Sequence, residues 1–375
     1  MHILLTGATG LLGQYLLRDL LLAGRQVAVL LRPQGRLSAA QRLEQLLARW
    51  DRELGRPLPR PVALEGDLCR EGLGLSREGR AWAAGHCGPV LHNAASLTFT
   101  GSDRAGEPWR SNLGGTGLLL EFCRRHRLRE FHYVSTAYVC GRRTDAVREG
   151  EFDQGRGFRN DYEHSKCEAE KLVRAADCLS PVTVYRPAVI VGDSRTGYTP
   201  TYHGLYLYLR FTALLAQFLP HDPDGRLHYP IRLTLTGDEP RNLVPVDWVA
   251  AVIAHVLSRP DLHGRTYHLS PPDPVPFRRV HEALAEYFRL YGPTYVGPDA
   301  LGRADMNEHE KMFYDAIANY EGYWAREPHF DCRHTLAAAP HLPCPPLDRA
   351  CLLRLIDYAV RDEFGRKREA RRAGA

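Results

Sequence analysis

The stretch "ILLTGATGLLGQYLL" near the start of the chain limits the possible fold more than any other feature. Gly7, Gly10 and Gly13 directly follow a strand-like run and open a helical pattern. Glycine in such positions permits a tight turn, lets the backbone approach a phosphate closely, and allows tight packing between strand and helix. The amino end of the helix would favour a negatively charged pyrophosphate. The order of strand, turn and helix therefore predicts a dinucleotide-binding unit.

Short apolar runs alternate with longer helical patterns through the first two hundred residues. This alternation is typical of a parallel sheet covered by helices, so we expect a doubly wound, mostly parallel α/β fold. The expected strands are residues 2–6, 26–31, 61–66, 89–94, 131–136 and 182–187, and the expected helices are residues 12–23, 39–54, 106–126 and 161–176.

The alternation stops near residue 192 and returns briefly in "VPVDWVAAVIAHVLSRP" and "TYHLS". We expect a dinucleotide-binding domain formed by residues 1–192 and 242–270. Residues 193–241 and 271–375 are expected to form a smaller, discontinuous, mainly helical substrate-binding lobe with a C-terminal extension. Its tyrosines either line a tunnel for an acyl or aromatic group or pack in the core, and their mixed spacing favours packing. They are Tyr198, Tyr202, Tyr206 and Tyr208.

Composition argues against several classes of protein. No apolar run reaches the roughly 18–20 residues of a membrane span, and the N-terminus enters a strand without room for a signal sequence. We expect a cytoplasmic protein without a membrane span. The net charge of +5 is modest for 375 residues, so no nucleic-acid partner is expected. The nine cysteines and seventeen histidines show no disulfide framework or metal-ligand spacing, so no metal is predicted.

Arg32 ends the second expected strand, where an acidic residue typically binds the 2′-hydroxyl of NAD. An arginine would instead bind a 2′-phosphate, which favours NADP(H) as the cofactor. Arg36 and Arg42 follow closely enough to assist, or are surface residues. Asp67 ends the third strand, where its carboxylate can accept from the adenine amino group. Asn112 either braces a neighbouring strand end or caps a helix.

Ser135 and Thr136 follow the fifth strand, at the edge where open α/β sheets bind ligands. Tyr162 and Lys166 come about 25 residues later, four positions apart, and lysine is rare in this chain. Together these groups suit carbonyl reduction by hydride from the cofactor. The tyrosine donates a proton, the threonine hydrogen-bonds the same oxygen, and the ammonium group lowers the tyrosine pKa and holds the nicotinamide ribose.

With these motifs the sequence resembles the extended short-chain dehydrogenase/reductases, which have the Rossmann fold. Within them it is similar to the thioester reductase and fatty acyl reductase (male sterility, NAD-binding) group. The resemblance covers about residues 3–270. It rests on "TGATGLLG", "LLRP", "GDLCREGLGLS", "LHNAA", "NLGGTGLLL", "VSTAYV", "YEHSKCEAEKLV", "YRPAVIVGDSRTG" and "NLVPVDWVA".

The resemblance implies that Thr136, Tyr162 and Lys166 are catalytic, with Thr136 favoured over Ser135. The segment "SLTFTGSDRAGEPW" and the last hundred residues depart from the family pattern, and both should shape the substrate pocket. The expected cofactor-binding residues are Gly7, Thr9, Gly10, Leu11, Leu12, Gly13, Arg32, Arg42, Asp67, Leu68, Asn93, Ala94, Ala95, Asn112, Tyr162, Lys166, Pro187 and Val189.

We therefore expect an NADPH-dependent reductase of an acyl thioester, or of the derived aldehyde or ketone, in secondary or lipid metabolism. Coenzyme A or an acidic carrier protein would present the thioester in trans, and the basic end of the chain, with Arg368, Arg371 and Arg372, would assist docking or is simply solvated. The alternatives are a nucleotide-sugar epimerase or dehydratase, another ketone reductase of this fold, and a non-catalytic NADP-binding protein.

Overall fold

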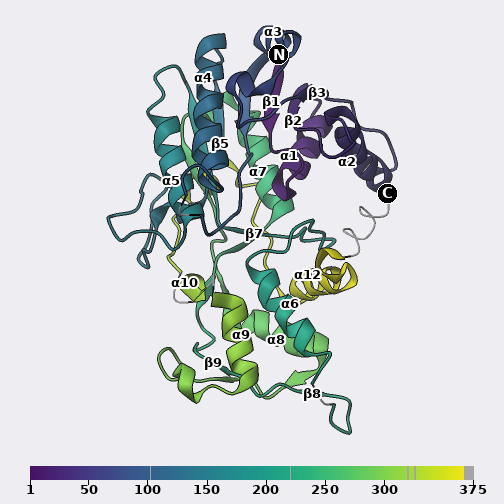
Figure 1. The fold of residues 1–375 in the computed structure, drawn as a ribbon, viewed down its shortest axis with the longest axis vertical. Helices are drawn as coiled ribbons and strands as arrows, with labels where there is room; N and C mark the ends of the chain where they lie inside the picture. Colours follow the sequence, from purple (N-terminus) through teal and green to yellow (C-terminus); the bar gives the residue numbers. More distant parts are fainter. Residues whose placement is uncertain (102, 220, 319–320, 325–326, 367–375) are drawn as a thin grey trace. The chain divides into compact units, whose positions relative to one another are not determined.

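The computed structural model (Figure 1), which describes residues 1–101, 103–219, 221–318, 321–324 and 327–366, contains a seven-stranded parallel sheet. The strand order is β12-β6-β5-β4-β1-β2-β3, and each neighbouring pair is parallel. The strands are β1 (His2–Thr6), β2 (Val27–Leu31), β3 (Val62–Glu65), β4 (Cys87–His92), β5 (Phe131–Val134), β6 (Val182–Pro187) and β12 (Thr266–Leu269).

The strand order shows how the chain winds. It runs outward from β1 to β3, returns to place β4 beside β1, and continues outward to β6. Crossovers between parallel strands are almost always right-handed, so this reversal of winding puts the connecting helices of the two halves on opposite faces. The strand order therefore confirms the predicted doubly wound parallel sheet. The associated helices are α1 (Leu11–Leu22), α2 (Ala39–Leu54), α3 (Arg77–His86), α4 (Thr116–His126), α5 (Asp161–Arg174), α7 (Val246–Leu257) and α11 (Arg333–Ala338).

Local sequence explains several of these elements. All five residues of β2, "VAVLL", are buried, as expected for a parallel strand covered on both faces. Helix α2 begins with a capping box between Ser38 and Gln41 and ends at Gly55 in the left-handed region. These local signals mark both ends of α2.

A fully buried ion pair attaches α5 to β6. Arg186 Nη2 lies 2.7 Å from Oε1 of Glu170, and its Nε lies 3.0 Å from Oε2. Arg186 Nη1 also donates to the carbonyl oxygen of Glu151 at 2.7 Å. Burial opposes ionisation of Glu170, but the adjacent Arg186 and Arg174 guanidinium groups hold the pKa of its carboxyl below the ordinary value. The pair therefore fixes the position of α5 along the sheet.

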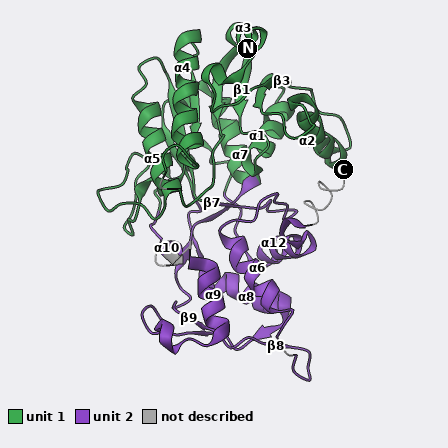
Figure 2. Cartoon of the chain, in the orientation of Figure 1, with its two compact units in different colours: residues 1–188, 247–269, 330–343 green, residues 189–246, 270–329, 344–375 purple. Residues whose placement is uncertain are grey.

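The described chain forms two compact units (Figure 2), each made of three segments. Unit 1 comprises residues 1–188, 247–269 and 330–343, and unit 2 comprises residues 189–246, 270–329 and 344–375. All of residues 271–375 were expected in the substrate lobe, whereas residues 330–343 belong to unit 1. The reason is hydrogen bonding to the sheet, since Thr335 Oγ1 donates to the carbonyl oxygen of His268 in β12 at 2.8 Å.

Unit 2 has its own apolar core, built on helices and short strand pairs. Tyr206 and Tyr208 are buried in that core, so the packing interpretation holds for these two tyrosines. Tyr202 packs against the core and donates to a carboxylate oxygen of Asp362 at 2.7 Å. The elements are β7 (Val189–Val191), α6 (Leu205–Leu215), β8 (Leu227–His228), β9 (Arg232–Leu233), β10 (Pro240–Arg241), β11 (Leu243–Pro245), β13 (Val275–Pro276), α8 (Phe277–Phe288), β14 (Leu290–Tyr291), β15 (Thr294–Tyr295), α9 (Glu308–Ile317), α10 (Glu321–Trp324) and α12 (Arg349–Arg361).

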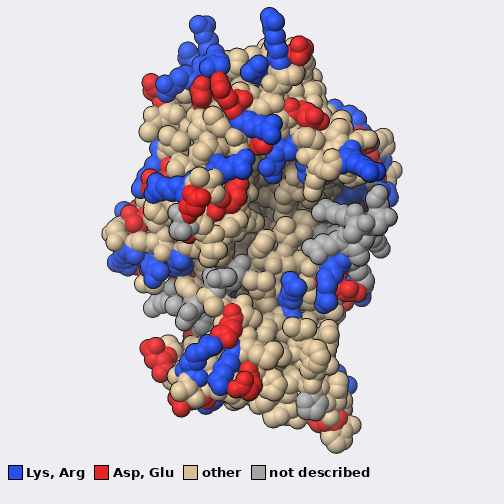
Figure 3. Space-filling model, viewed as in Figure 1, with Lys and Arg blue, Asp and Glu red and all other residues tan. Residues whose placement is uncertain are grey.

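The surface carries both signs of charge, with basic and acidic side chains interspersed over the visible face of unit 1 (Figure 3). Among the residues that the structure describes, no helix has both the length and the apolar character needed to cross a bilayer. The arginines of the basic end, Arg368, Arg371 and Arg372, lie outside the described residues, so their suggested part in docking stays a prediction.

We expect the Glu170→Ala variant to lower the free energy of unfolding by about 3–5 kcal/mol, because it leaves the Arg186 charge buried without its counterion. Urea unfolding at pH 7 measures this loss. The matched control is Glu168→Ala on the same helix, where a more exposed carboxylate pairs with Lys171 and the change should stay below about 1 kcal/mol. Equal losses in the two variants would contradict the importance of the buried pair.

Candidate active site

The carboxyl ends of β1 and β4 meet where the winding of the sheet reverses direction, which is the usual ligand-binding edge of such sheets. A single hydroxyl group ties the two strand ends together. Thr6 Oγ1 accepts from the backbone N–H groups of Asn93 at 3.2 Å and Ala94 at 3.1 Å, and it lies 2.7 Å from Nδ1 of His92. The glycine turn after β1 therefore has a fixed neighbour in the "HNAA" loop.

The three glycines of the turn have different surroundings. Gly7 has φ +72°, and a Cβ there would lie 2.6 Å from the backbone nitrogen of Ala94. A Cβ on Gly13 would lie 2.0 Å from the carbonyl oxygen of Gly7, whereas a Cβ on Gly10 would meet nothing closer than 3.5 Å. Gly7 and Gly13 are therefore required by the protein's own packing, while Gly10 leaves room beside its backbone for a bound group.

Helix α1 begins directly after Gly10, and its amino end is suited to an anion. Gly10 as the N-cap provides no side-chain hydrogen bond, and no acidic residue lies in the first turn. The first N–H groups of the helix are thus left without a capping side chain at its positive end. Thr9 and Leu11 are partly buried and Leu12 is buried. These features fit the pyrophosphate of a dinucleotide.

The ends of β2 and β3 border a cavity of about 680 Å³, whose lining includes Arg32, Glu65, Asp67 and Arg70. Glu65 accepts from the backbone N–H of Ala39, and Asp67 accepts from that of Cys69, both at 3.0 Å. Both carboxylates are therefore already hydrogen-bonded within the protein.

Two arginines lie at the end of β2. Arg32 is exposed, and its guanidinium has no hydrogen-bond partner among the described residues. Arg42 Nη1 donates to the carbonyl oxygen of Arg32. The Arg42 side chain thus contacts the backbone of Arg32, and a role of either guanidinium in binding a phosphate stays a prediction. Leu68, by contrast, is buried, and its side chain lies 3.0 Å from the position that a Cβ on Gly115 would take.

Asn112 lies in a π-helical turn, η2 (Arg110–Gly115), directly before α4, and π turns occur often at functional sites. Its Nδ2 donates to the carbonyl oxygen of Ser96 at 3.1 Å and to Ser165 Oγ at 3.0 Å. Its Oδ1 accepts from the backbone N–H of Ser96 at 2.7 Å. Asn112 therefore braces the loop after β4 and also reaches α5, and it does not act as a helix cap.

A buried hydrogen-bond chain lies under this edge of the sheet. Thr116 Oγ1 donates to the carbonyl oxygen of Asn112 at 2.6 Å and must therefore accept from Nε2 of His92, 2.9 Å away. His92 Nδ1 then accepts from Thr6 Oγ1. Burial, with the nearby positive charge of Lys166, lowers the pKa of His92 to about 3, so this imidazole is neutral at physiological pH.

Helix α5 begins at its N-cap Asn160, whose side chain accepts from the backbone N–H of Glu163 at 2.9 Å. Tyr162 lies in the first turn, partly buried, and its ring stacks on Phe99 with 6.0 Å between centroids. Burial raises the pKa of the Tyr162 hydroxyl above its ordinary value, while a hydrogen bond with Thr136 opposes the rise. Tyr162 and Thr136 are thus brought together.

Lys166, one turn further along α5, is buried and turned toward β5. Its Nζ donates to the hydroxyl oxygen of Tyr133 and to the carbonyl oxygen of Val134, each at 2.8 Å. Burial lowers the pKa of Lys166 to about 7, although the Glu170 carboxylate raises it. Sequence reasoning missed Tyr133, because no spacing signal connects a strand residue with a helix residue 33 positions later.

The structure also places His164, Pro187 and Val189. His164 is partly buried, since its ring stacks on Phe158 at 4.7 Å and meets Trp109 edge-on at 5.0 Å. These two rings come from segments whose approach to α5 the helical pattern could not show. Pro187 ends β6 in unit 1, whereas Val189 begins β7 in unit 2, so their place beside a nicotinamide stays a prediction.

Comparison with known proteins gives a family match. The family model described as male sterility protein matches residues 5–253. The nonribosomal peptide synthetase asaC of Aspergillus flavus is 28% identical over 288 residues, covering 72% of this chain and 26% of that protein. The aldehyde reductase lnbA of the same fungus is 28% identical over 287 residues, with the same two coverages. The chain thus spans about a quarter of the length of these relatives.

Solved structures match over almost the whole chain. The terminal R domain from the myxalamid PKS-NRPS biosynthetic pathway has a TM-score of 0.77 and 27% identity, covering 97% of this chain and 91% of that one. UDP-glucose 4-epimerase from Bifidobacterium longum has a TM-score of 0.65 and 19% identity, covering 97% and 100%. At 19% identity, the similarity to the epimerase shows only that the two proteins share a fold.

Substituting the glycines separates their roles in packing. We expect Gly13→Ala to lower the free energy of unfolding by roughly 1–3 kcal/mol, because the backbone must move to admit a methyl group. Gly10→Ala should lower the free energy of unfolding by less than about 1 kcal/mol, because the added methyl group meets nothing closer than 3.5 Å. Urea unfolding of the two variants tests this difference, and a Gly13→Ala protein as stable as the wild type would contradict the close contact with Gly7.

Proposed function

Because the chain belongs to the male sterility protein family, we propose that this NAD(P)-dependent oxidoreductase uses NADPH to reduce an acyl thioester to an aldehyde. The observation that carries the proposal is the arrangement on α5. Thr136 lies close enough to the Tyr162 hydroxyl to lower its pKa, and Lys166 is buried one turn later. All three lie in unit 1, as does the uncapped amino end of α1.

The proposed roles follow from the chemistry of each side chain. A bound NADPH supplies a hydride to the carbonyl carbon of the thioester. Tyr162 donates its proton to the oxygen as negative charge develops there, and Thr136 donates a hydrogen bond to the same oxygen. The ammonium group of Lys166 lowers the tyrosine pKa in the transition state. The resulting hemithioacetal then releases the thiol and leaves an aldehyde, which balances one hydride and one proton.

NADPH is proposed over NADH because of the end of β2. Arg32 stands where an acidic side chain would bind a free ribose hydroxyl, and its guanidinium makes no hydrogen bond with the described residues. Arg42 is held at the Arg32 carbonyl. A 2′-phosphate would give the Arg32 guanidinium a partner of opposite charge and bidentate geometry, with Arg42 beside it.

The acyl thioester is proposed from the relatives. A nonribosomal peptide synthetase and an aldehyde reductase match this chain, and the R domain of a PKS-NRPS pathway shares 27% of its sequence. Such pathways carry acyl groups as thioesters, so we propose a substrate presented by a carrier protein or coenzyme A. Reduction of the derived aldehyde at the same site would consume a second NADPH.

A direct assay tests the reaction. Purified protein with NADPH and a panel of acyl-carrier and acyl-CoA thioesters should oxidise NADPH and release thiol, with NADH much less effective. Tyr162→Phe should bind NADPH as the wild type does but lose about 10²–10⁴-fold in kcat, the usual contribution of a positioned general acid. Tyr291→Phe, a change of the same type on β14, should keep normal turnover.

Three results would contradict this proposal. They are the absence of NADPH oxidation with every thioester, turnover of a UDP-sugar in its place, and unchanged kcat in Tyr162→Phe. The ratio of NADPH consumed to thiol released distinguishes an aldehyde product from an alcohol, since the ratio is one for the first and two for the second.

The lowered pKa of Lys166 predicts that the protein takes up a proton when it binds NADPH. The folded-state pKa of Lys166 is about 7, below its ordinary value, so most of the free enzyme lacks this proton at pH 8. Negatively charged NADPH favours the ammonium form. We therefore expect binding to take up close to one proton at pH 8 and almost none at pH 6, so that affinity falls as pH rises above 7.

Calorimetric titration of NADPH in two buffers with different ionisation enthalpies measures the proton uptake. Lys166→Met should abolish the uptake, whereas Lys171→Met, at an exposed position on the same helix, should preserve it. Uptake that persists in Lys166→Met would assign the proton to another group.

A further inference from the structure

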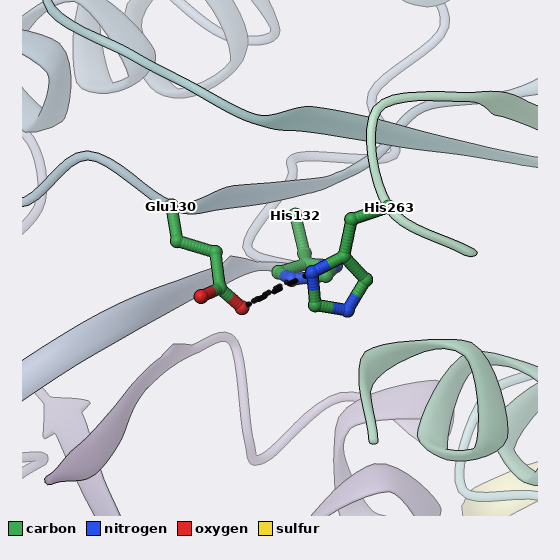
Figure 4. A group of neighbouring side chains, drawn as sticks. All are labelled: Glu130, His132 and His263. Atoms are coloured by element: carbon green, nitrogen blue, oxygen red, sulfur yellow. Dashed lines mark hydrogen bonds and ion pairs between the residues drawn. The ribbon is translucent and has the colours of Figure 1, made fainter. Parts of the chain in front are cut away.

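Three side chains of types that can bind a metal ion converge at the amino end of β5, and the proposed reduction does not use them (Figure 4). Glu130 directly precedes β5, His132 lies within it, and His263 follows the 3-10 turn η4 (Pro260–Leu262). One ligand atom from each lies within 4.8 Å of the other two. Thr136 follows the opposite end of the same strand, so this cluster is separate from the candidate active site.

The hydrogen bonds of His263 leave one lone pair directed at a carboxylate. Its Nε2 lies 3.1 Å from the carbonyl oxygen of Val256 and 3.3 Å from that of Leu257. Carbonyl oxygens only accept, so Nε2 carries the proton of the neutral ring. Nδ1 therefore holds a lone pair, 3.6 Å from Oε1 of Glu130. Two acceptors that face each other at this distance repel each other unless a proton or a metal cation lies between them.

His132 adds a third donor atom to the same point. Its Nε2 lies 3.0 Å from Oε1 of Glu130, and its Nδ1 lies 2.9 Å from the hydroxyl oxygen of Tyr185. When Nδ1 donates to Tyr185, the Nε2 lone pair faces the other two ligand atoms. Metal-binding histidines usually make such a bond through the second ring nitrogen, which fixes the tautomer.

Burial makes the cluster a formed site with an entry path. The side chain of His132 is 0% exposed and that of His263 is 6% exposed, while Glu130 is 33% exposed. The two imidazoles are therefore held in place by the protein, and the carboxylate reaches solvent. Ring contact at 4.6 Å between centroids restricts the histidines further.

We propose that Glu130, His132 and His263 bind a divalent transition-metal ion of the zinc class, with solvent completing the coordination. Two imidazoles and a carboxylate are a donor set that zinc accepts. Zinc bonds of about 2.0–2.1 Å with tetrahedral angles put ligand atoms roughly 3.3–3.4 Å apart, close to the 3.0 Å and 3.6 Å observed for two of the pairs. The ion ties the turn after α7 to β5 and has a structural role.

Metal content tests this site without reference to turnover. The protein is stripped with a chelator, dialysed against zinc chloride and analysed by mass spectrometry of the metal. The wild type should retain one zinc per chain and unfold at a higher temperature with zinc than without it. Glu130→Gln and His263→Ala should lose both the zinc and the thermal shift. His86→Ala, an exposed histidine on α3, should keep both.

Two spectra complete the test. Cobalt in place of zinc should give visible bands without a thiolate charge-transfer band, which excludes the cysteines as ligands. Nitrogen-15 NMR should show Nδ1 of His263 without a proton in the metal-free protein and shifted on addition of zinc. Retention no greater than in His263→Ala, or an Nδ1 that stays protonated and does not respond to zinc, would overturn the proposal. A failure of the reductase assay would leave it intact.

Discussion

The ion pair between Arg186 and Glu170 is the contact on which the geometry of the proposed catalytic residues depends. Helix α5 carries Tyr162 and Lys166 near its beginning. Glu170, the carboxylate of the ion pair, lies on the same helix one turn beyond Lys166. Arg186 is itself fixed, because it also binds backbone carbonyl groups of Glu149 and Glu151. Buried ion pairs often add little net stability. Here the pair sets the position of a helix that would otherwise pack on the sheet through non-directional apolar contacts.

A second constraint on α5 comes from a chain of hydrogen bonds that begins at β1 and β4. Thr6, His92 and Thr116 form a chain in which each proton has one assigned place, and Asn112 extends it to Ser165. Every bond in this chain joins neutral groups, so it holds β1, β4, the π turn and α5 together without adding charge beside Lys166. The charge of that lysine is then governed by burial and by Glu170, which explains a pKa close to neutrality.

Sequence patterns predicted the parts of this protein that depend on neighbouring residues. The apolar runs located six strands of the sheet, and the capping signals around Ser38 and Gly55 agree with the ends of α2. The glycine turn was predicted because each glycine meets a local requirement for a tight turn, for close approach of a phosphate or for close packing of strand and helix. Tyr133, the surroundings of His164 and the return of residues 330–343 to unit 1 were missed. Each depends on packing between segments that are far apart in the sequence. The spacing of apolar residues along one segment does not indicate such contacts. The approach of His263 to Glu130 and His132 is of the same kind.

The division of the chain into three segments for each unit has a consequence for how such a protein can change. A module that enters and leaves a scaffold once can be exchanged by recombination at two junctions. Here the chain passes between the units after residues 188, 246, 269, 329 and 343, so an exchange of unit 2 would have to preserve five junctions together. Changes in unit 2 are therefore easier to acquire by point substitution than by replacement of the whole unit.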